Sequence, residues 1–162
     1  MGTSRATSIG VGDSAPDLEL PSQAGEPVRL SDFRGERVVV LYFYPKDNTP
    51  GCTAEACSFR DYYEAFTDAG AEVIGISSDS VGSHEAFSSR HRLPFLLVTD
   101  ADGELRRNYG VKSHMGVLPG RVTFVIDRDG IVRQVFSSMT NIDGHVSEAL
   151  RVVKELQGGA NG

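Results

Sequence analysis

The two cysteines of the chain lie close together, within the segment TPGCTAEAC at residues 49–57. Four residues separate Cys52 from Cys57, and a Thr-Pro-Gly sequence comes directly before Cys52. A turn of this kind followed by helix-forming residues indicates the first turn of a helix. The backbone N–H groups there have no partner inside the helix and favour the ionised thiolate. Cys52 is therefore the stronger candidate nucleophile.

The spacing of the two thiols places them on different sides of that helix. An α-helix turns about 100° per residue, so Cys52 shares the inward stripe with Ala56 and Phe59, whereas Cys57 lies about 140° away. Their Cα atoms are then about 8.6 Å apart, beyond the limit of about 7 Å for a disulfide bond. A bond between them requires the first helical turns to unwind. The pair therefore suits a reaction cycle better than a static cross-link.

A metal site has weaker support from the sequence. Zinc takes about four ligands, and the chain has no second pair of cysteines. The histidines show no ligand spacing to one another, and we expect each to be a surface or capping residue: His84, His91, His114 and His145. We expect no metal or other cofactor.

The composition indicates one globular domain over residues 1–162. The hydrophobic fraction of 40% and the charged fraction of 23% are ordinary for such a domain. Residues 1–10 and 158–162 are expected to be flexible tails. A net charge of -6 with scattered basic residues argues against nucleic acid as a partner.

The expected location follows from the absence of targeting patterns in the sequence. No apolar run approaches the roughly 20 residues that span a membrane, and the first residues lack the apolar stretch of a secretory signal. We expect a cytoplasmic protein, although a mature organellar form would look the same. In a reducing compartment, a close pair of thiols is more often metal-binding or redox-active than structural. No apolar interface stripe is evident, so we expect a monomer.

Apolar periodicity predicts an α/β fold. Short runs at residues 18–20 and 27–30 predict an N-terminal β-hairpin. Continuous apolar runs predict buried strands over 37–45, 71–77 and 95–100. Apolar residues at spacings of three and four predict a helix over 53–66, and an amphipathic pattern predicts a last helix that includes Val146 and Leu156. Two further helices are expected over 80–91 and about 103–110. After a loop over 111–120, the segments 121–127 and 131–136 predict a second hairpin. This order indicates a mixed central β-sheet flanked by helices.

The segment YFYPKDNTPGCTAEAC resembles the active-site segment of the peroxiredoxins. Their signature Pro-x-x-x-Thr-x-x-Cys is matched by Pro45, Thr49 and Cys52. The further cysteine, Cys57, and the sequence Thr-Pro-Gly-Cys are similar to the bacterioferritin comigratory protein, or peroxiredoxin Q, subfamily. The segments APDLEL, GISSDS and GRVTFVID follow in the order of that family. The resemblance extends over about residues 10–156.

The resemblance implies a thioredoxin-like fold and a peroxidase that needs no metal, haem or flavin. Its substrates would be hydrogen peroxide and organic hydroperoxides. The resemblance implies that Cys52 is the peroxidatic cysteine, which forms a sulfenic acid, and that Cys57 resolves it as an intrachain disulfide. It also implies that Arg121 is the active-site arginine, and that thioredoxin, or else glutaredoxin, returns the enzyme to its reduced form.

The chemistry of peroxide reduction agrees with these assignments. The departing oxygen gains negative charge, and fixed hydrogen-bond donors stabilise it. Thr49 offers a hydroxyl group, Gly51 and Cys52 offer backbone N–H groups, and Arg121 offers a charged planar group.

Two further residues near the motif have expected positions. Pro45 has no N–H to donate, so we expect it to fix the turn and shield the thiolate from water. Glu55 would disfavour the thiolate if it faced the sulfur, so we expect it to point away, toward Arg121. Taken alone, Arg121 also suits a solvated strand edge, Thr49 an ordinary turn, and Pro45 the end of a strand.

Other functions remain open at this point. A peroxide sensor that passes its disulfide to a partner protein would use the same first step. A general disulfide oxidoreductase usually carries Cys-x-x-Cys, which this chain lacks. A purely structural module would leave the two thiols unexplained.

Overall fold

The computed structural model describes residues 9–111 and 120–160. The loop expected over 111–120 therefore lies almost wholly outside the described residues, as does His114. The same holds for residues 1–8 and 161–162 of the expected tails.

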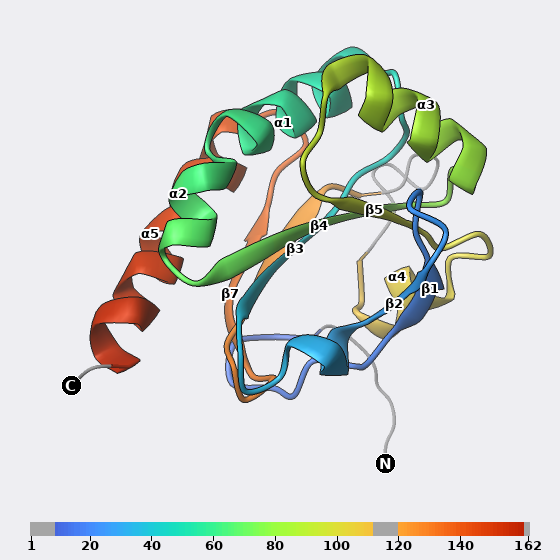
Figure 1. The fold of residues 1–162 in the computed structure, drawn as a ribbon. Helices are drawn as coiled ribbons and strands as arrows, with labels where there is room; N and C mark the ends of the chain where they lie inside the picture. Colours follow the sequence, from blue (N-terminus) through green and yellow to red (C-terminus); the bar gives the residue numbers. More distant parts are fainter. Residues whose placement is uncertain (1–8, 112–119, 161–162) are drawn as a thin grey trace.

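A five-stranded mixed sheet runs through the centre of the structure (Figure 1). Its spatial order is β5-β4-β3-β6-β7, with the bounds β3 Val38–Phe43, β4 Ala71–Ser77, β5 Leu96–Thr99, β6 Val122–Ile126 and β7 Val132–Ser137. Strands β3, β4 and β5 are parallel to one another, whereas β6 is antiparallel to both β3 and β7. A separate N-terminal hairpin pairs β1 (Glu19–Pro21) with β2 (Pro27–Arg29). The predicted mixed sheet and N-terminal hairpin are confirmed.

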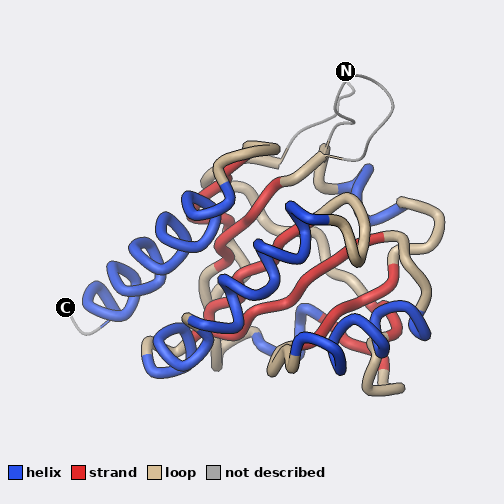
Figure 2. Tube along the Cα trace, turned by 90° about the horizontal axis from the view of Figure 1, so that it is seen from above, coloured by secondary structure: helices blue, strands red, loops and turns tan. Residues whose placement is uncertain are grey.

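Helices and short segments cover both faces of the sheet. One face packs against α1 (Pro50–Asp61), α2 (Tyr63–Asp68), α3 (Val81–His91) and α5 (Ile142–Ala160). The other face packs against the N-terminal hairpin, the 3-10 helix η2 (Leu30–Phe33) and α4 (Glu104–Asn108). Figure 2 shows helices lying across the red strands when the molecule is seen from above.

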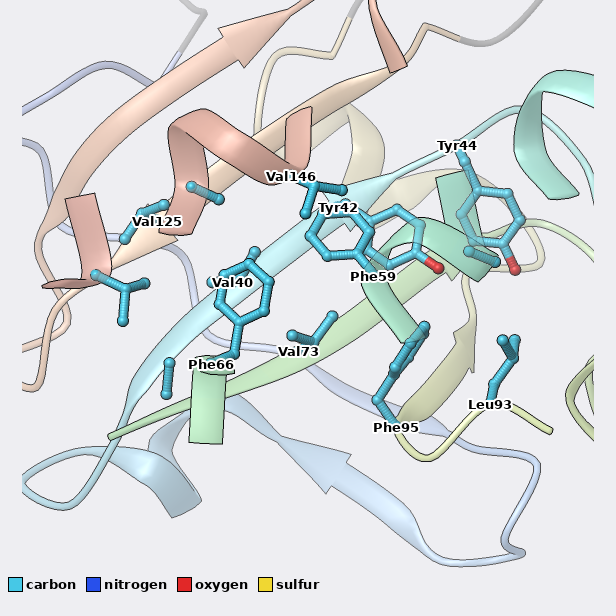
Figure 3. Packing of buried hydrophobic residues seen from close by; sticks show 14 of the residues in the cluster. Val40, Tyr42, Tyr44, Phe59, Phe66, Val73, Leu93, Phe95, Val125 and Val146 are labelled. Atoms are coloured by element: carbon cyan, nitrogen blue, oxygen red, sulfur yellow. The ribbon is translucent and has the colours of Figure 1, made fainter. Parts of the chain in front are cut away.

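Strand β3 is buried along its whole length because the sheet is covered on both faces. Its side chains alternate between two cores. Val40 and Tyr42 face α1 and α5, whereas Leu41 and Phe43 face the N-terminal segments. The ring of Tyr42 stacks on Phe59 of α1, with 4.5 Å between the ring centroids (Figure 3). This packing fixes α1 on the strand that leads into it.

The single helix predicted over 53–66 is wrong in its bounds. The helix begins earlier, at Pro50, because proline suits the first helical position, where its missing N–H costs nothing. It then ends at Asp61, and α2 begins after Tyr62. Buried residues recur at helical spacing on both sides of Tyr62, so the sequence pattern carries no signal of this break. The last helix also extends further than expected, to Ala160.

Candidate active site

Cys52 lies in the first turn of α1, where the chain passes from β3 into the helix. Thr49 is the N-cap residue, and Pro50 and Gly51 form the first two helical positions. The side chain of Cys52 is only 1% exposed and belongs to the core beneath the helices. The predicted position of Cys52 in the first turn of a helix is therefore confirmed.

Arg121 lies immediately before β6 and reaches the same turn of α1. A Cβ atom on Gly51 would lie 3.0 Å from Nη2 of Arg121, so the guanidinium passes directly over this glycine. Nη1 of Arg121 donates to Oε1 of Glu55 at 2.6 Å, and Nε donates to the carbonyl of Met139 at 3.2 Å. Arg121 is 5% exposed, so the interpretation of a solvated strand edge is wrong.

Glu55 points toward Arg121, as expected from the sequence. It is fully buried, and burial raises the pKa of Glu55 to about 7, although the charge of Arg121 acts to lower it. Burial lowers the pKa of Arg121 in turn. The net pKa of Arg121 is nevertheless above its ordinary value, because the negative charges of Glu55 and Cys52 favour the cation. The guanidinium is therefore a permanently charged donor beside the thiol.

Pro45 and Thr49 lie in the loop between β3 and α1, and both are half-buried. The hydroxyl group of Thr49 donates to the carbonyl of Lys46 at 2.9 Å. To donate to a bound peroxide, this hydroxyl hydrogen would have to leave Lys46. Thr49, Cys52 and Arg121 thus meet around one end of α1, while Pro45 follows the end of β3.

Cys57 lies further along α1 and is half-buried, in contrast to Cys52. Both cysteines are free thiols in this structure. The different burial of the two residues agrees with the predicted placement on different sides of the helix. While α1 is intact, the structure does not bring the two sulfur atoms together as a disulfide.

The loop that precedes α1 is anchored to α3 by a buried carboxylate. Oδ1 of Asp47 accepts from the hydroxyl of Tyr44 at 2.6 Å, and Oδ2 lies 2.7 Å from Nδ1 of His84. Ser83 donates to the same Oδ2 at 2.9 Å. Burial raises the pKa of Asp47, but hydrogen bonds from His84 and Tyr44 outweigh it, so the net pKa is lowered. The loop therefore has a fixed ionic contact with the next helix.

His84 and His145 are both fully buried, so the expectation of surface or capping residues is wrong for them. Each satisfies both ring nitrogens inside the protein, which makes burial tolerable. The sequence held a signal for His145, because it lies four residues before Ala149 and so shares the inward stripe of the last helix. Asp47 sits within the recognised motif, but nothing in the pattern identified His84 as its partner.

No group of three or more His, Cys, Asp or Glu residues suited to a metal ion occurs within 9–111 and 120–160. None of the helices in this part of the chain combines the length and apolarity of a membrane span.

A model of the AhpC/TSA family matches residues 11–135, and the chain belongs to this family. Peroxiredoxin Q, chloroplastic, of Sedum lineare is 48% identical over 147 residues, which cover 90% of this chain and 78% of that protein. The protein of the same name from Triticum aestivum is 45% identical over 160 residues, covering 94% and 73% of the two chains.

Solved structures of such proteins share the fold. The peroxidoxin BcpB of Mycobacterium tuberculosis superposes with a TM-score of 0.84 at 41% identity, covering 91% of this chain and 97% of that one. Peroxiredoxin Q of Xanthomonas campestris gives a TM-score of 0.80 at 35% identity, covering 86% and 91%. The thioredoxin-like fold and the resemblance to the bacterioferritin comigratory protein, or peroxiredoxin Q, subfamily are confirmed. The chain is therefore a peroxidase of the peroxiredoxin class.

Proposed function

We propose that this chain reduces hydrogen peroxide and organic hydroperoxides with Cys52 as the nucleophile and Cys57 as the resolving thiol. One observation carries the proposal: a buried thiol in the first turn of a helix lies beside Arg121, whose guanidinium is held by Glu55. These residues supply a thiolate and a fixed positive charge within one small volume, as a reaction with a charged leaving group requires.

In the first step the Cys52 thiolate attacks one peroxide oxygen. The S–O bond forms as the O–O bond breaks, and Cys52 becomes a sulfenic acid. The second oxygen departs with the electron pair of the broken bond and takes up a proton, which gives water or an alcohol. Arg121 and the N–H groups of the first helical turn stabilise the charge on this oxygen, and Thr49 supplies a further donor once it turns from Lys46.

In the second step the Cys57 thiol attacks the sulfenic sulfur. A disulfide forms and water leaves, so the oxidation passes from one thiol to the pair. The two residues lie on one intact helix, so the start of α1 must open first. The stacking of Phe59 on Tyr42 and the buried side chain of Phe66 in α2 hold the remainder of the helical layer during this opening.

A dithiol protein of the thioredoxin type then reduces the disulfide, with glutaredoxin as an alternative donor. A monomer is expected, because the sequence shows no apolar interface stripe. The curated relatives are named as chloroplastic proteins, which agrees with the organellar alternative that the sequence leaves open beside a cytoplasmic location.

Stopped-flow measurement of peroxide consumption, followed by mass analysis of the oxidised chain, tests this function. The reduced chain should lose two hydrogens on reaction with one equivalent of peroxide. Cys52→Ser should abolish the reaction, whereas Cys57→Ser should react once, gain one oxygen and then stop. Peroxide consumption by Cys52→Ser would contradict the assignment.

The same samples separate the peroxidase from a sensor that passes its disulfide to a client protein. The peroxidase should turn over repeatedly with thioredoxin and its reductase. A chain that oxidises once and exchanges with thioredoxin only slowly would instead favour the sensor.

A further inference from the structure

The hydrogen bonds of His145 define a single state of its ring. Nε2 lies 2.7 Å from the carbonyl oxygen of Ser138, which can only accept, so Nε2 carries the hydrogen. Nδ1 lies 2.7 Å from Oγ1 of Thr123. Burial and the positive charge of Arg121 lower the pKa of His145 to about 4, so the ring is neutral at neutral pH and Nδ1 accepts from the threonine hydroxyl. The ring is therefore held at both ends.

On one side, the ring contacts the segment that also binds the guanidinium of Arg121. Ser138 accepts from the ring and precedes Met139, whose carbonyl accepts from Nε of Arg121 at 3.2 Å. The backbone N–H of Ser138 also donates to the carbonyl of Arg121 at 3.2 Å. Thr123 lies two residues after Arg121, on the same side of the strand. The ring thus fixes the short segment that holds one edge of the guanidinium.

On the other side the ring lies against Glu55. Nδ1 of His145 is 3.7 Å from Oε2 of Glu55, while Oε1 accepts from Arg121. Oε2 has no hydrogen-bond partner among the residues that the structure describes. The imidazole therefore occupies the space into which the carboxylate would otherwise rotate. His145, from α5, limits the position of the group that holds the second edge of the guanidinium.

We propose that His145 is a positioning residue for Arg121, because its ring fixes Ser138 and Met139 on one side of the guanidinium and confines Glu55 on the other. The inference rests on the proposed function, in which Arg121 stabilises the departing peroxide oxygen. His145 contacts neither the reacting atoms nor Cys52 through any hydrogen bond in the described residues. It acts on the geometry of another residue, and small displacements of such a charged group weaken transition-state stabilisation strongly.

The experiment compares two reactions of Cys52 in a Cys57→Ser background. The reaction with hydrogen peroxide needs the charge of Arg121 at the departing oxygen. Alkylation by iodoacetamide needs only an accessible thiolate, since its leaving group is iodide. The ratio of the two rate constants therefore isolates the contribution of Arg121. A general loosening of the fold would change both reactions and move this ratio little.

The variants separate the two hydrogen bonds of the ring. His145→Gln places an amide donor near the position of Nε2, so it keeps the bond to Ser138 but loses the acceptor for Thr123, and should lower the ratio several-fold, less than His145→Asn. His145→Asn keeps an acceptor near Nδ1 but loses the bond to Ser138, and should lower the ratio about tenfold, the equivalent of one hydrogen bond. Thr123→Val removes the hydroxyl donor at nearly constant volume and should lower the ratio several-fold. His91→Asn, on α3, is the control and should leave the ratio unchanged.

A double substitution shows whether His145 acts through Arg121. With Arg121 replaced by Gln, adding His145→Asn should produce no further fall in the ratio. An equal fall in that background, or unchanged ratios in both His145→Asn and Thr123→Val, would overturn the inference. If His145→Asn does not fold, an unchanged ratio in Thr123→Val is sufficient to overturn it. An absence of peroxide reaction in the parent protein would instead contradict the proposed function itself.

Discussion

At the scale of single residues, the site depends on a glycine as much as on its charged groups. Gly51 occupies the second position of α1, and a Cβ atom there would lie only 3.0 Å from Nη2 of Arg121, so the guanidinium would have to shift to admit a side chain. Gly82 occupies the second position of α3, where a Cβ atom would meet only Oγ of Ser80 at 3.9 Å. The two glycines therefore differ in what surrounds them and not in their place within a helix.

This difference gives a prediction for Gly51→Ala. Alanine favours the helix by up to about 1 kcal/mol, so stability should be maintained or increased. The added methyl group displaces Arg121, so the rate constant of Cys52 with peroxide should fall about tenfold. Urea unfolding and stopped-flow kinetics measure the two effects. Gly82→Ala should gain similar stability and keep full activity, and an active Gly51→Ala would show that Arg121 has freedom to move.

At the scale of the elements, the loop before α1 is attached to α3 through a charged pair. Nε2 of His84 faces the carbonyl of Val98 at 3.1 Å, and Nδ1 faces the carboxylate of Asp47 at 2.7 Å. Both neighbours accept, so both ring nitrogens donate and the buried imidazole carries a positive charge. The pair joins the catalytic loop, α3 and β5 at one point.

Removing one partner of this pair should be costly. His84→Leu leaves the buried carboxylate of Asp47 without a counter-charge and should destabilise the fold by about 3–5 kcal/mol in urea unfolding. Asp47→Asn added to His84→Leu should lose less than the sum of the two single changes. As a control, Arg29→Ala breaks the exposed pair with Glu19 and should cost under about 1 kcal/mol. A similar small cost for His84→Leu would contradict a charged ring.

The sequence predicted the strands and helices better than the positions at which one helix ends and the next begins. Apolar runs identified the buried strands, because a strand covered on both faces must be apolar throughout, as β3 is. The break at Tyr62 could not be predicted, since helical spacing continues through it. Cys52 and Arg121 were recognised through the resemblance to the peroxiredoxins. The direction of Glu55 was predicted because its charge would disfavour the thiolate if it faced the sulfur. The buried position of His84 was not predicted, because its partner Asp47 is distant in sequence and only the folded chain brings them together.

At the scale of the whole molecule, two buried groups have opposite effects on stability. Burial raises the pKa of Glu55 from 4.5 to about 7, so its contribution to stability is present below pH 4.5 and is lost as pH rises through 7. Burial lowers the pKa of His145 from 6.5 to about 4, so the unfolded chain binds more protons than the folded chain between these values. The contribution of His145 to the free energy of unfolding therefore rises with pH between about 4 and 6.5.

The two slopes oppose each other between pH 4.5 and 6.5 in the wild-type chain. In Glu55→Gln only the pH dependence due to His145 remains, so the free energy of unfolding of this variant should increase with pH relative to wild type. His145→Gln should leave the slope of Glu55, so its stability should decrease with pH. Each slope can reach about 1.4 kcal/mol per pH unit. Urea unfolding at several pH values measures this, and identical pH dependence in all three chains would contradict these assignments.

The residues that surround Arg121 come from distant parts of the chain: Cys52 and Glu55 from α1, Thr123 from β6, and His145 from α5. A chain emerging from the ribosome presents its reactive sulfur long before its last helix has been synthesised. The contacts of His145 with Ser138 and Glu55, which flank the charged group beside that sulfur, form only when α5 docks on the sheet. On the proposed role of His145, full reactivity toward peroxide therefore requires that α5 has been synthesised and has docked on the sheet.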